Sequence, residues 1–223
     1  MKTMIIVPVF NEGMRCVDTI NQILLVSKCD VIVVDDGSRD DSLQILNNKF
    51  KKNKRVYVLS HIINLGKGAA MKTGIKMAWK LGSDAVIFID ADGQHNPKYL
   101  PKFEAGLEQR DMVFGYRRLN GNMPFVRKYG NMAAKAIVRF LFGVKRKEFL
   151  CGYLGFKKSV YKKIKWQSSR YGVETEIATK VGRNQLTFLE VEIDTIYIDK
   201  YKGVSLFDAM KILIQIPFWY FSK

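Results

Sequence analysis

Short apolar runs alternate with amphipathic segments along the first half of the chain. The runs at residues 4–9, 31–34, 56–59 and 85–89 are almost continuously apolar, which is typical of strands buried on both faces of a sheet. After the first run, apolar residues recur at the spacing of one helix face, in Val17, Ile20, Ile23 and Leu24. A second helical pattern covers residues 66–81. The alternation predicts four successive β-then-α units.

Such a succession predicts an α/β fold with a mostly parallel central sheet and helices on both faces. Ligands of these sheets bind beyond the carboxyl ends of the strands. Polar or acidic loops directly follow three of the predicted strands, at residues 8–12, 35–38 and 90–94. We therefore expect one binding site built from these three loops.

The second half of the chain has a different pattern. A fifth strand is predicted at residues 111–114, and a helix at 172–185 precedes a strand at 187–198. Between them, the apolar residues of 125–141 follow one helical stripe, and the basic residues lie off it: Arg127, Lys128, Lys135 and Arg139. This basic amphipathic helix is either an ordinary core helix or an interfacial helix on an anionic membrane.

The net charge of +16 is concentrated in one block. Residues 117–170 carry 15 basic side chains and a single acidic one, Glu148, whereas the rest of the chain is close to neutral. A field of this kind favours an anionic partner, which is a nucleic acid, an anionic lipid surface or a phosphorylated substrate. The alternative is a solvated basic face without a partner.

Other features of the sequence exclude several classes. The three cysteines, Cys16, Cys29 and Cys151, have no C-x-x-C spacing, which favours buried reduced thiols over a disulfide framework. Two histidines are too few for a zinc site built from histidine. No uninterrupted apolar run of about 18 residues and no secretory signal is present, so we expect neither a membrane-spanning helix nor export.

Asp90 and Asp92 follow the fourth predicted strand, and two carboxylates at this spacing can point into one crevice. Clustered carboxylates repel each other, so they require a compensating cation or proton. Their hard oxygen ligands suit Mg²⁺ or Mn²⁺, with the remaining positions filled by water and substrate phosphates. A D-x-D string alone is weak evidence, and its position after a buried strand strengthens it.

Two further loops have both a structural and a functional interpretation. Residues 35–38 (DDGS) form either a turn with a helix cap or a carboxylate site for a base or ribose. Residues 64–68 (NLGKG) form either a helix start or a loop in which the backbone approaches a phosphate and Lys67 neutralises it. The Walker A spacing is absent.

Five motifs in order resemble family-2 glycosyltransferases with the GT-A fold. They are residues 7–12 (VPVFNE), 33–38 (VVDDGS), 64–68 (NLGKG), 90–95 (DADGQH) and 115–117 (GYR). Within that family the chain is most similar to the polyprenyl-phosphate or dolichyl-phosphate mannose and glucose synthases, over about residues 3–205. The resemblance implies a catalytic domain at 1–205. The apolar segment at 206–223 is a candidate membrane-surface helix.

The resemblance also implies roles for individual residues. The residues expected to bind the base and ribose are Pro8, Phe10, Glu12, Val34 and Asp36. The metal and diphosphate segment comprises Asp90, Ala91, Asp92 and Gln94, with Asp90, Asp92 and Gln94 as the metal-binding residues. Lys67, Arg117 and Lys200 are expected to contact the donor phosphates. We expect Arg127 and Lys128 to bind an acceptor phosphate. The expected catalytic residues are Asp92 and Arg117, with Glu174 or Glu176 lining the site.

The chain departs from the family pattern at several positions. Phe10 replaces a more common tyrosine, and residues 151–153 (CGY) stand where Ser-Gly-Phe is usual. Lys200 stands in place of an arginine, and the two are not interchangeable at a bidentate phosphate site. For Glu174 and Glu176 the alternative is a solvated helix start whose acids suit the helix dipole.

The sequence therefore predicts an inverting, metal-dependent hexosyltransferase that uses GDP-mannose or UDP-glucose, Mg²⁺ or Mn²⁺, and a polyprenyl or dolichyl phosphate acceptor. We expect it on the cytoplasmic face of a membrane, held peripherally by the basic block. One alternative is a family-2 enzyme that glycosylates a sugar hydroxyl of a wall or surface glycan. A nucleic-acid-binding protein is less favoured because acidic loops repel phosphates, so no nucleic acid is expected as a partner. A donor-binding protein without turnover is the least favoured.

Overall fold

The computed structural model describes residues 1–117, 139–141, 143–149, 151–169, 172–194 and 196. Most of the predicted amphipathic helix at 125–141 and the segment 206–223 lie outside these residues. Arg127, Lys128 and Lys200 lie outside them as well. Within the described residues, no helix is both long and apolar enough to cross a bilayer.

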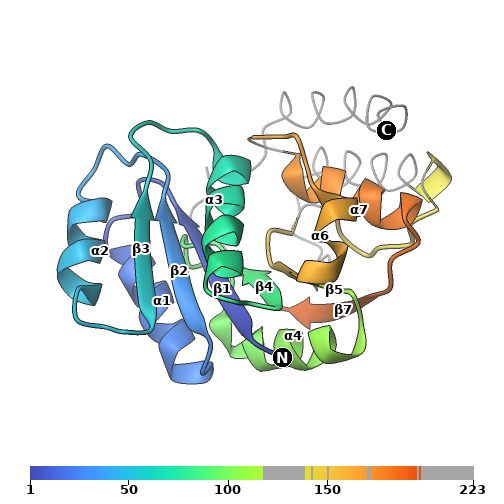
Figure 1. Cartoon of the computed structure of the whole chain (residues 1–223), viewed down its shortest axis with the longest axis horizontal. Coiled ribbons are helices and arrows are strands. Elements are labelled where there is room, and N and C mark those ends of the chain that lie inside the picture. The colour runs from blue at the N-terminus through green and yellow to red at the C-terminus, as the bar shows by residue number, and fades with distance from the viewer. Residues whose placement is uncertain (118–138, 142, 150, 170–171, 195, 197–223) are drawn as a thin grey trace.

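A seven-stranded sheet forms the centre of the molecule (Figure 1). Its order is β3 (Val56–Ser60), β2 (Asp30–Asp35), β1 (Thr3–Val9), β4 (Ala85–Phe88), β6 (Leu154–Lys157), β5 (Met112–Arg117) and β7 (Phe188–Ile193). The sheet is parallel except for β6, which pairs antiparallel with β4 and β5. The predicted mostly parallel α/β sheet is confirmed, and β6 is the strand that the hydrophobic pattern did not predict.

Helices cover both faces of the sheet because the strands are apolar on both sides. One face packs against α1 (Met14–Val26), α2 (Ser42–Phe50) and α4 (Leu100–Gln109), and the other against α3 (Lys67–Lys80), α6 (Tyr161–Ile164) and α7 (Val173–Arg183). Short 3₁₀ turns at Pro97–Tyr99 and Lys158–Val160 precede α4 and α6. In β1, Ile5 and Val7 face the first layer of helices, whereas Met4 and Ile6 face the second.

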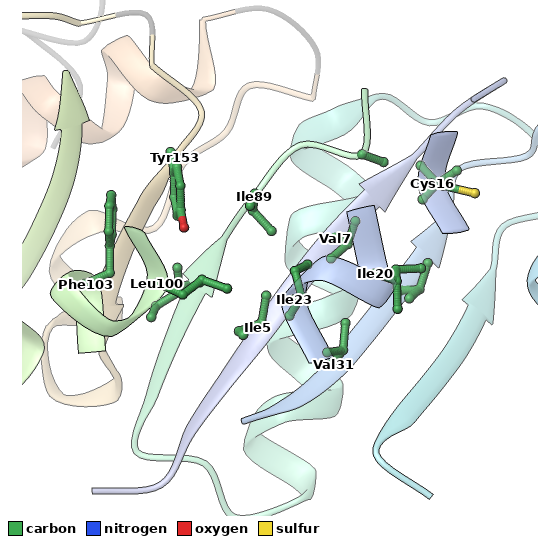
Figure 2. Close-up of a cluster of buried hydrophobic side chains, with 14 of the residues drawn as sticks. Ile5, Val7, Cys16, Ile20, Ile23, Val31, Ile89, Leu100, Phe103 and Tyr153 are labelled. Atoms are coloured by element: carbon green, nitrogen blue, oxygen red, sulfur yellow. The ribbon is translucent and has the colours of Figure 1, made fainter. Parts of the chain in front are cut away.

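Figure 2 shows the core between the sheet and α1, where Ile20 and Ile23 lie over Ile5, Val7 and Val31. All five side chains are fully buried. Burial of each such side chain contributes about 1.5–3 kcal/mol. The sheet is thereby fixed as a rigid base, and the loops at its carboxyl edge are held in place by it.

Candidate active site

The loops after β1 and β2 are joined to each other by hydrogen bonds. The backbone N–H of Asp36 donates to the carbonyl of Val9 at 2.8 Å, and the N–H of Asn11 donates to Ser38 Oγ at 3.0 Å. The Asn11 side chain in turn accepts from the N–H of Arg39 at 2.8 Å. Because β4 is the next parallel neighbour of β1, the loop at 90–94 begins at the same edge of the sheet. The three loops therefore share one edge, as the sequence predicts.

Asp36 ties these loops to the segment before α3. Its side chain is almost fully buried and accepts hydrogen bonds from the N–H groups of Leu65 at 3.0 Å and Gly66 at 2.7 Å. The ring of His61 bridges Asp36 Oδ1 at 2.7 Å and Thr73 Oγ1 at 2.8 Å. The carboxylate expected to meet the base or ribose thus holds the loop at 61–66 in place. His61 lies outside every motif, so this role could not be predicted from the sequence.

The other residues expected to hold the base and ribose differ in exposure. Val34 is fully buried in β2 and supports the site through packing. Pro8 and Glu12 are half-buried, and the Phe10 ring is 39% exposed. An exposed aromatic ring at the mouth of the site is suited to stack on a base.

Lys67, at the start of α3, lies between two carboxylates. Its Nζ is 2.6 Å from Asp90 Oδ1 and 2.8 Å from Glu174 Oε1, which joins α3, the β4 loop and α7. Burial alone would lower the pKa of Lys67, but the charges of Asp90 and Glu174 raise it well above its ordinary value. Burial would likewise raise the pKa of Asp90, and the Lys67 ammonium outweighs this and lowers it. Lys67 and Asp90 therefore both carry their charges near neutral pH.

Gly152 fits closely against this cluster. A Cβ at this position would overlap the Lys67 ammonium and lie 2.6 Å from Asp90 Oδ2. Only glycine leaves room for the Lys67–Asp90 pair, which explains the glycine at the centre of residues 151–153 in physical terms.

Asp92 differs from Asp90 because no cation is bonded to it among the described residues. Its Oδ1 accepts from the N–H of Gln94 at 2.9 Å. Burial and the neighbouring charge of Asp90 both raise its pKa. A carboxylate whose ionised form is disfavoured in this way gains most from a bound cation. Ala91, between the two acids, is buried, and its carbonyl accepts from the Thr19 hydroxyl at 3.3 Å.

The donor set fits Mg²⁺ or Mn²⁺. Among the described residues, no three His, Cys, Asp or Glu side chains gather in an arrangement that could hold a metal ion. Asp90, Asp92 and the half-buried Gln94 instead offer hard oxygen atoms, two of the three groups being carboxylates. Mg²⁺ and Mn²⁺ take this pattern because water and substrate phosphates complete their coordination.

His95 forms the inner wall of the site, a role that the sequence reasoning missed. It is buried, its Nδ1 accepts from the backbone N–H of Asp90 at 3.4 Å, and its Nε2 lies 3.9 Å from Cys151 Sγ. Burial lowers the pKa of His95 to about 4, so the ring is neutral at pH 7. An accepting Nδ1 assigns the proton to Nε2. The two residues are 56 positions apart, and their contact has no local sequence signal.

Arg117, at the end of β5, is held by Glu148. The Arg117 N–H donates to Glu148 Oε2 at 2.7 Å, and its Nε donates to Oε1 at 3.1 Å. The Arg117 side chain is 26% exposed and Glu148 is buried. The lone acid of the basic block therefore fixes the arginine that was expected near the donor phosphates.

The two glutamates of α7 have different surroundings. Glu174 joins the Lys67 cluster. Glu176 accepts from the N–H groups of Gln167 and Ser168 at 2.8 and 2.9 Å, and pairs with Lys180 at 2.8 Å. Burial would raise the pKa of Glu176, but the bonds from Lys180 and Ser168 lower it. Glu174 therefore lies at the candidate site, whereas Glu176 forms hydrogen bonds with the loop before α7.

Comparison with solved structures defines the class of fold. Glucosyl-3-phosphoglycerate synthase from Mycobacterium tuberculosis, crystallised with Mn²⁺, UDP and glucosyl-3-phosphoglycerate, matches with a TM-score of 0.74 at 18% sequence identity. The match covers 98% of this chain and 79% of that chain. The protein therefore has the GT-A architecture of nucleotide-sugar-dependent glycosyltransferases.

Comparison of sequences then defines the family. Glycosyl transferase family 2 matches residues 4–165, and the chain belongs to this family. A UDP-N-acetylglucosamine–dolichyl-phosphate N-acetylglucosaminyltransferase from Methanococcus voltae is 30% identical, over 95% of this chain and 93% of the relative. An undecaprenyl-phosphate mannosyltransferase from Micrococcus luteus is 27% identical, over 92% of this chain and 87% of the relative. The resemblance drawn from the five motifs is confirmed.

Proposed function

We propose that this protein is an inverting glycosyltransferase that moves a hexose from a nucleotide sugar, GDP-mannose or UDP-glucose, to a polyprenyl or dolichyl phosphate. The observation that carries the proposal is the Asp90–Lys67–Glu174 cluster, in which Lys67 lies between two carboxylates beside Asp92 at the carboxyl end of β4. Two relatives that match most of the chain carry polyprenyl-type phosphates in their names, which supports the acceptor class.

The donor binds along the loops after β1, β2 and β4. The exposed Phe10 ring stacks on the base, and Glu12 lies beside it for the ribose or base edge. Lys67 and Arg117 supply positive charge to the diphosphate. Both side chains are held by carboxylates before the donor arrives, so little reorganisation is needed when charge develops on the leaving group.

A divalent cation would be held by Asp92, with Asp90 and Gln94 beside it. When bound, Mg²⁺ or Mn²⁺ neutralises the diphosphate and stabilises its departure. Asp90 is shared between this role and its ion pair with Lys67, so Asp92 is the carboxylate most dependent on the cation.

In the transfer step, an oxygen of the acceptor phosphate forms a bond to the anomeric carbon of the sugar. The bond from that carbon to the donor diphosphate breaks on the opposite face, and its electron pair leaves on the nucleoside diphosphate. The configuration at the anomeric carbon is inverted. No proton is transferred, because a phosphate monoester is already ionised near neutral pH.

The two α7 carboxylates favour a phosphate acceptor over a hydroxyl acceptor. A sugar hydroxyl requires a general base whose pKa lies near the working pH. Glu174 is ion-paired with Lys67, and hydrogen bonds lower the pKa of Glu176. Glu174 is therefore occupied by a cation, and Glu176 is a weak base. Glycosylation of a hydroxyl on a wall or surface glycan remains the alternative function.

We further propose that the protein works at the cytoplasmic face of a membrane as a peripheral protein. Six lysines in the described part of the basic block are exposed: Lys145, Lys147, Lys158, Lys162, Lys163 and Lys165. Each well-placed cation near an anionic leaflet contributes about 1 kcal/mol. The same charge is the basis of the nucleic-acid alternative, which predicts tight DNA binding with a steep salt dependence and no nucleotide-sugar binding.

The test is a panel of radiolabelled nucleotide sugars, incubated with a polyprenyl phosphate or with glycan acceptors, with Mn²⁺ or EDTA. We expect a labelled lipid product with one donor in the presence of Mn²⁺ and none with EDTA. Transfer to glycan alone would overturn the acceptor assignment. Product that forms in EDTA would overturn the role of the metal.

A further inference from the structure

In the segment before Cys151, the side chain of Arg146 is buried inside the protein. From residue 144 to 148, Val144, Arg146 and Glu148 are buried, and Lys145 and Lys147 between them are exposed. The Arg146 side chain is fully buried. Its guanidinium carbon lies 3.5 Å from the centre of the Phe114 ring in β5 and 5.6 Å from that of Phe149.

No acceptor in the described part of the chain forms a hydrogen bond with the Arg146 side chain. Its Nε, Nη1 and Nη2 atoms are all buried without a hydrogen-bond partner. Glu190 in β7 lies 3.8 Å away, too far for a hydrogen bond, and its Oε1 already accepts from the N–H of Lys147 at 2.8 Å. A buried guanidinium with unsatisfied donors is costly, because it has lost its water without gaining replacement bonds.

Arg146 belongs to the same segment as three parts of the candidate site. Two residues further on, Glu148 holds Arg117. Cys151 then contacts His95, and Gly152 packs against the Lys67–Asp90 pair. Burial lowers the pKa of Arg146 to about 10, although the charges of Glu190, Glu148 and Glu174 act in the opposite direction. Arg146 remains a cation at pH 7 and lies beside the site, on its β5–β7 side.

We propose that Arg146 binds the phosphate monoester of the acceptor. This inference rests on the proposed function. A guanidinium over the face of an aromatic ring can keep its N–H groups free for two oxygens of a phosphate. The donor diphosphate already has Lys67 and Arg117, so an arginine without hydrogen bonds, two residues before Glu148, suits the second phosphate. An arriving phosphate supplies the acceptors that Arg146 lacks.

The test compares Arg146→Met with Lys147→Met, which removes the same charge from the exposed neighbour. We expect Arg146→Met to raise the KM for polyprenyl phosphate about tenfold or more, the usual effect of losing hydrogen bonds between charged groups. Affinity for the nucleoside diphosphate should stay unchanged. The melting temperature without ligand should change little, because the buried guanidinium that is removed makes no hydrogen bond and Glu190 keeps its bond from the Lys147 N–H. Lys147→Met should change the KM for polyprenyl phosphate by no more than the loss of one exposed lysine from the basic block, and should leave the binding of a short-chain prenyl monophosphate in solution unchanged.

Direct binding separates this inference from the proposed function. A short-chain prenyl monophosphate, the matching prenyl alcohol and inorganic phosphate are titrated into the protein without a donor. Binding of the monophosphate but not the alcohol, lost in Arg146→Met, supports the inference even if no sugar transfer is found. Unchanged monophosphate binding overturns it, as does an equal loss of nucleoside diphosphate binding. If Arg146→Met does not fold, the same titration is made with Arg146→Lys. This variant keeps the positive charge but loses the paired N–H donors of the guanidinium.

Discussion

The two ends of the sheet differ in how their polar groups are satisfied. At the β3-β2-β1-β4 end, Asp36 is buried with three donors on its two oxygens, and the loops on either side of it are bonded to each other. At the β6-β5-β7 end, Arg146 is buried with none of its donors bonded. Among the described residues, the loops at the first end are bonded around a satisfied carboxylate, although Asp35 Oδ1 there has no hydrogen-bond partner, whereas the second end contains a buried guanidinium without any hydrogen bond. We infer that the donor side is preformed and that the acceptor side is completed by its substrate.

Lys67 and Glu174 connect these two ends. They are 107 positions apart, and their contact fastens α3, from the donor side, to α7, from the other side. The ion pair therefore holds the donor side and the α7 side together.

The largest effect is expected at the donor side, from Asp92→Asn. Loss of the charge removes the carboxylate most dependent on the cation, and we expect kcat to fall about 10²–10³-fold, as for other groups that stabilise developing charge. Asp18→Asn, the same change on the exposed face of α1, should have no effect. The measurements are kcat and the Mn²⁺ concentration for half-maximal rate. Full activity in Asp92→Asn would show that the cation binds elsewhere.

The next effect concerns the scaffold beside α7. Glu176→Gln should lower the free energy of unfolding by about 2–3 kcal/mol at pH 7, since several hydrogen bonds to a buried carboxylate are weakened. The pKa of Glu176 is lower in the folded protein than the ordinary value of 4.5. Its contribution is therefore complete above about pH 4.5 and is lost as the pH falls through the lower folded pKa.

Urea unfolding at pH 7 and at about pH 4 checks this sign. The difference between the two proteins should be largest at pH 7 and should shrink in acid. The activity of the folded fraction should not change. A kcat that falls while stability is unaltered would instead place Glu176 in the reaction.

Much of the donor side could be predicted because its signals are local. Asp90 and Asp92 directly follow an apolar strand, so the strand pattern alone places them at the edge of the sheet. β6 was missed because it has four residues, includes Gly155 and pairs antiparallel with strands distant in sequence. Gly155 reads as a turn residue, but a Cβ there would lie only 2.9 Å from the Val86 carbonyl, so the close approach of the strands requires glycine.

The glutamates of α7 show a second limit of sequence reasoning. Residues two apart on a helix are rotated by about 200° around the helix axis and so point to nearly opposite sides. Only one of Glu174 and Glu176 can therefore face a given site. The sequence alone does not say which face of α7 meets α3. Arg146 is a similar case, because its burial depends on β5 and β7 packing around an irregular segment.

The smallest effect, Glu174→Gln, tests the connection between the two sides. Lys67 would lose one of its two carboxylates and pair more strongly with Asp90, in competition with the cation. We expect the Mn²⁺ concentration for half-maximal rate to rise about tenfold, which corresponds to about 1.4 kcal/mol, with kcat restored at saturating Mn²⁺. Glu176→Gln is the matched control, since it makes the same change two residues away and should leave the Mn²⁺ requirement unaltered. If Glu174 were instead the general base for a hydroxyl acceptor, kcat would fall by about 10²–10⁴-fold and added Mn²⁺ would not restore it. The response to Mn²⁺ therefore distinguishes a glutamate that positions Lys67 from one that takes a proton, and with it a phosphate acceptor from a hydroxyl acceptor.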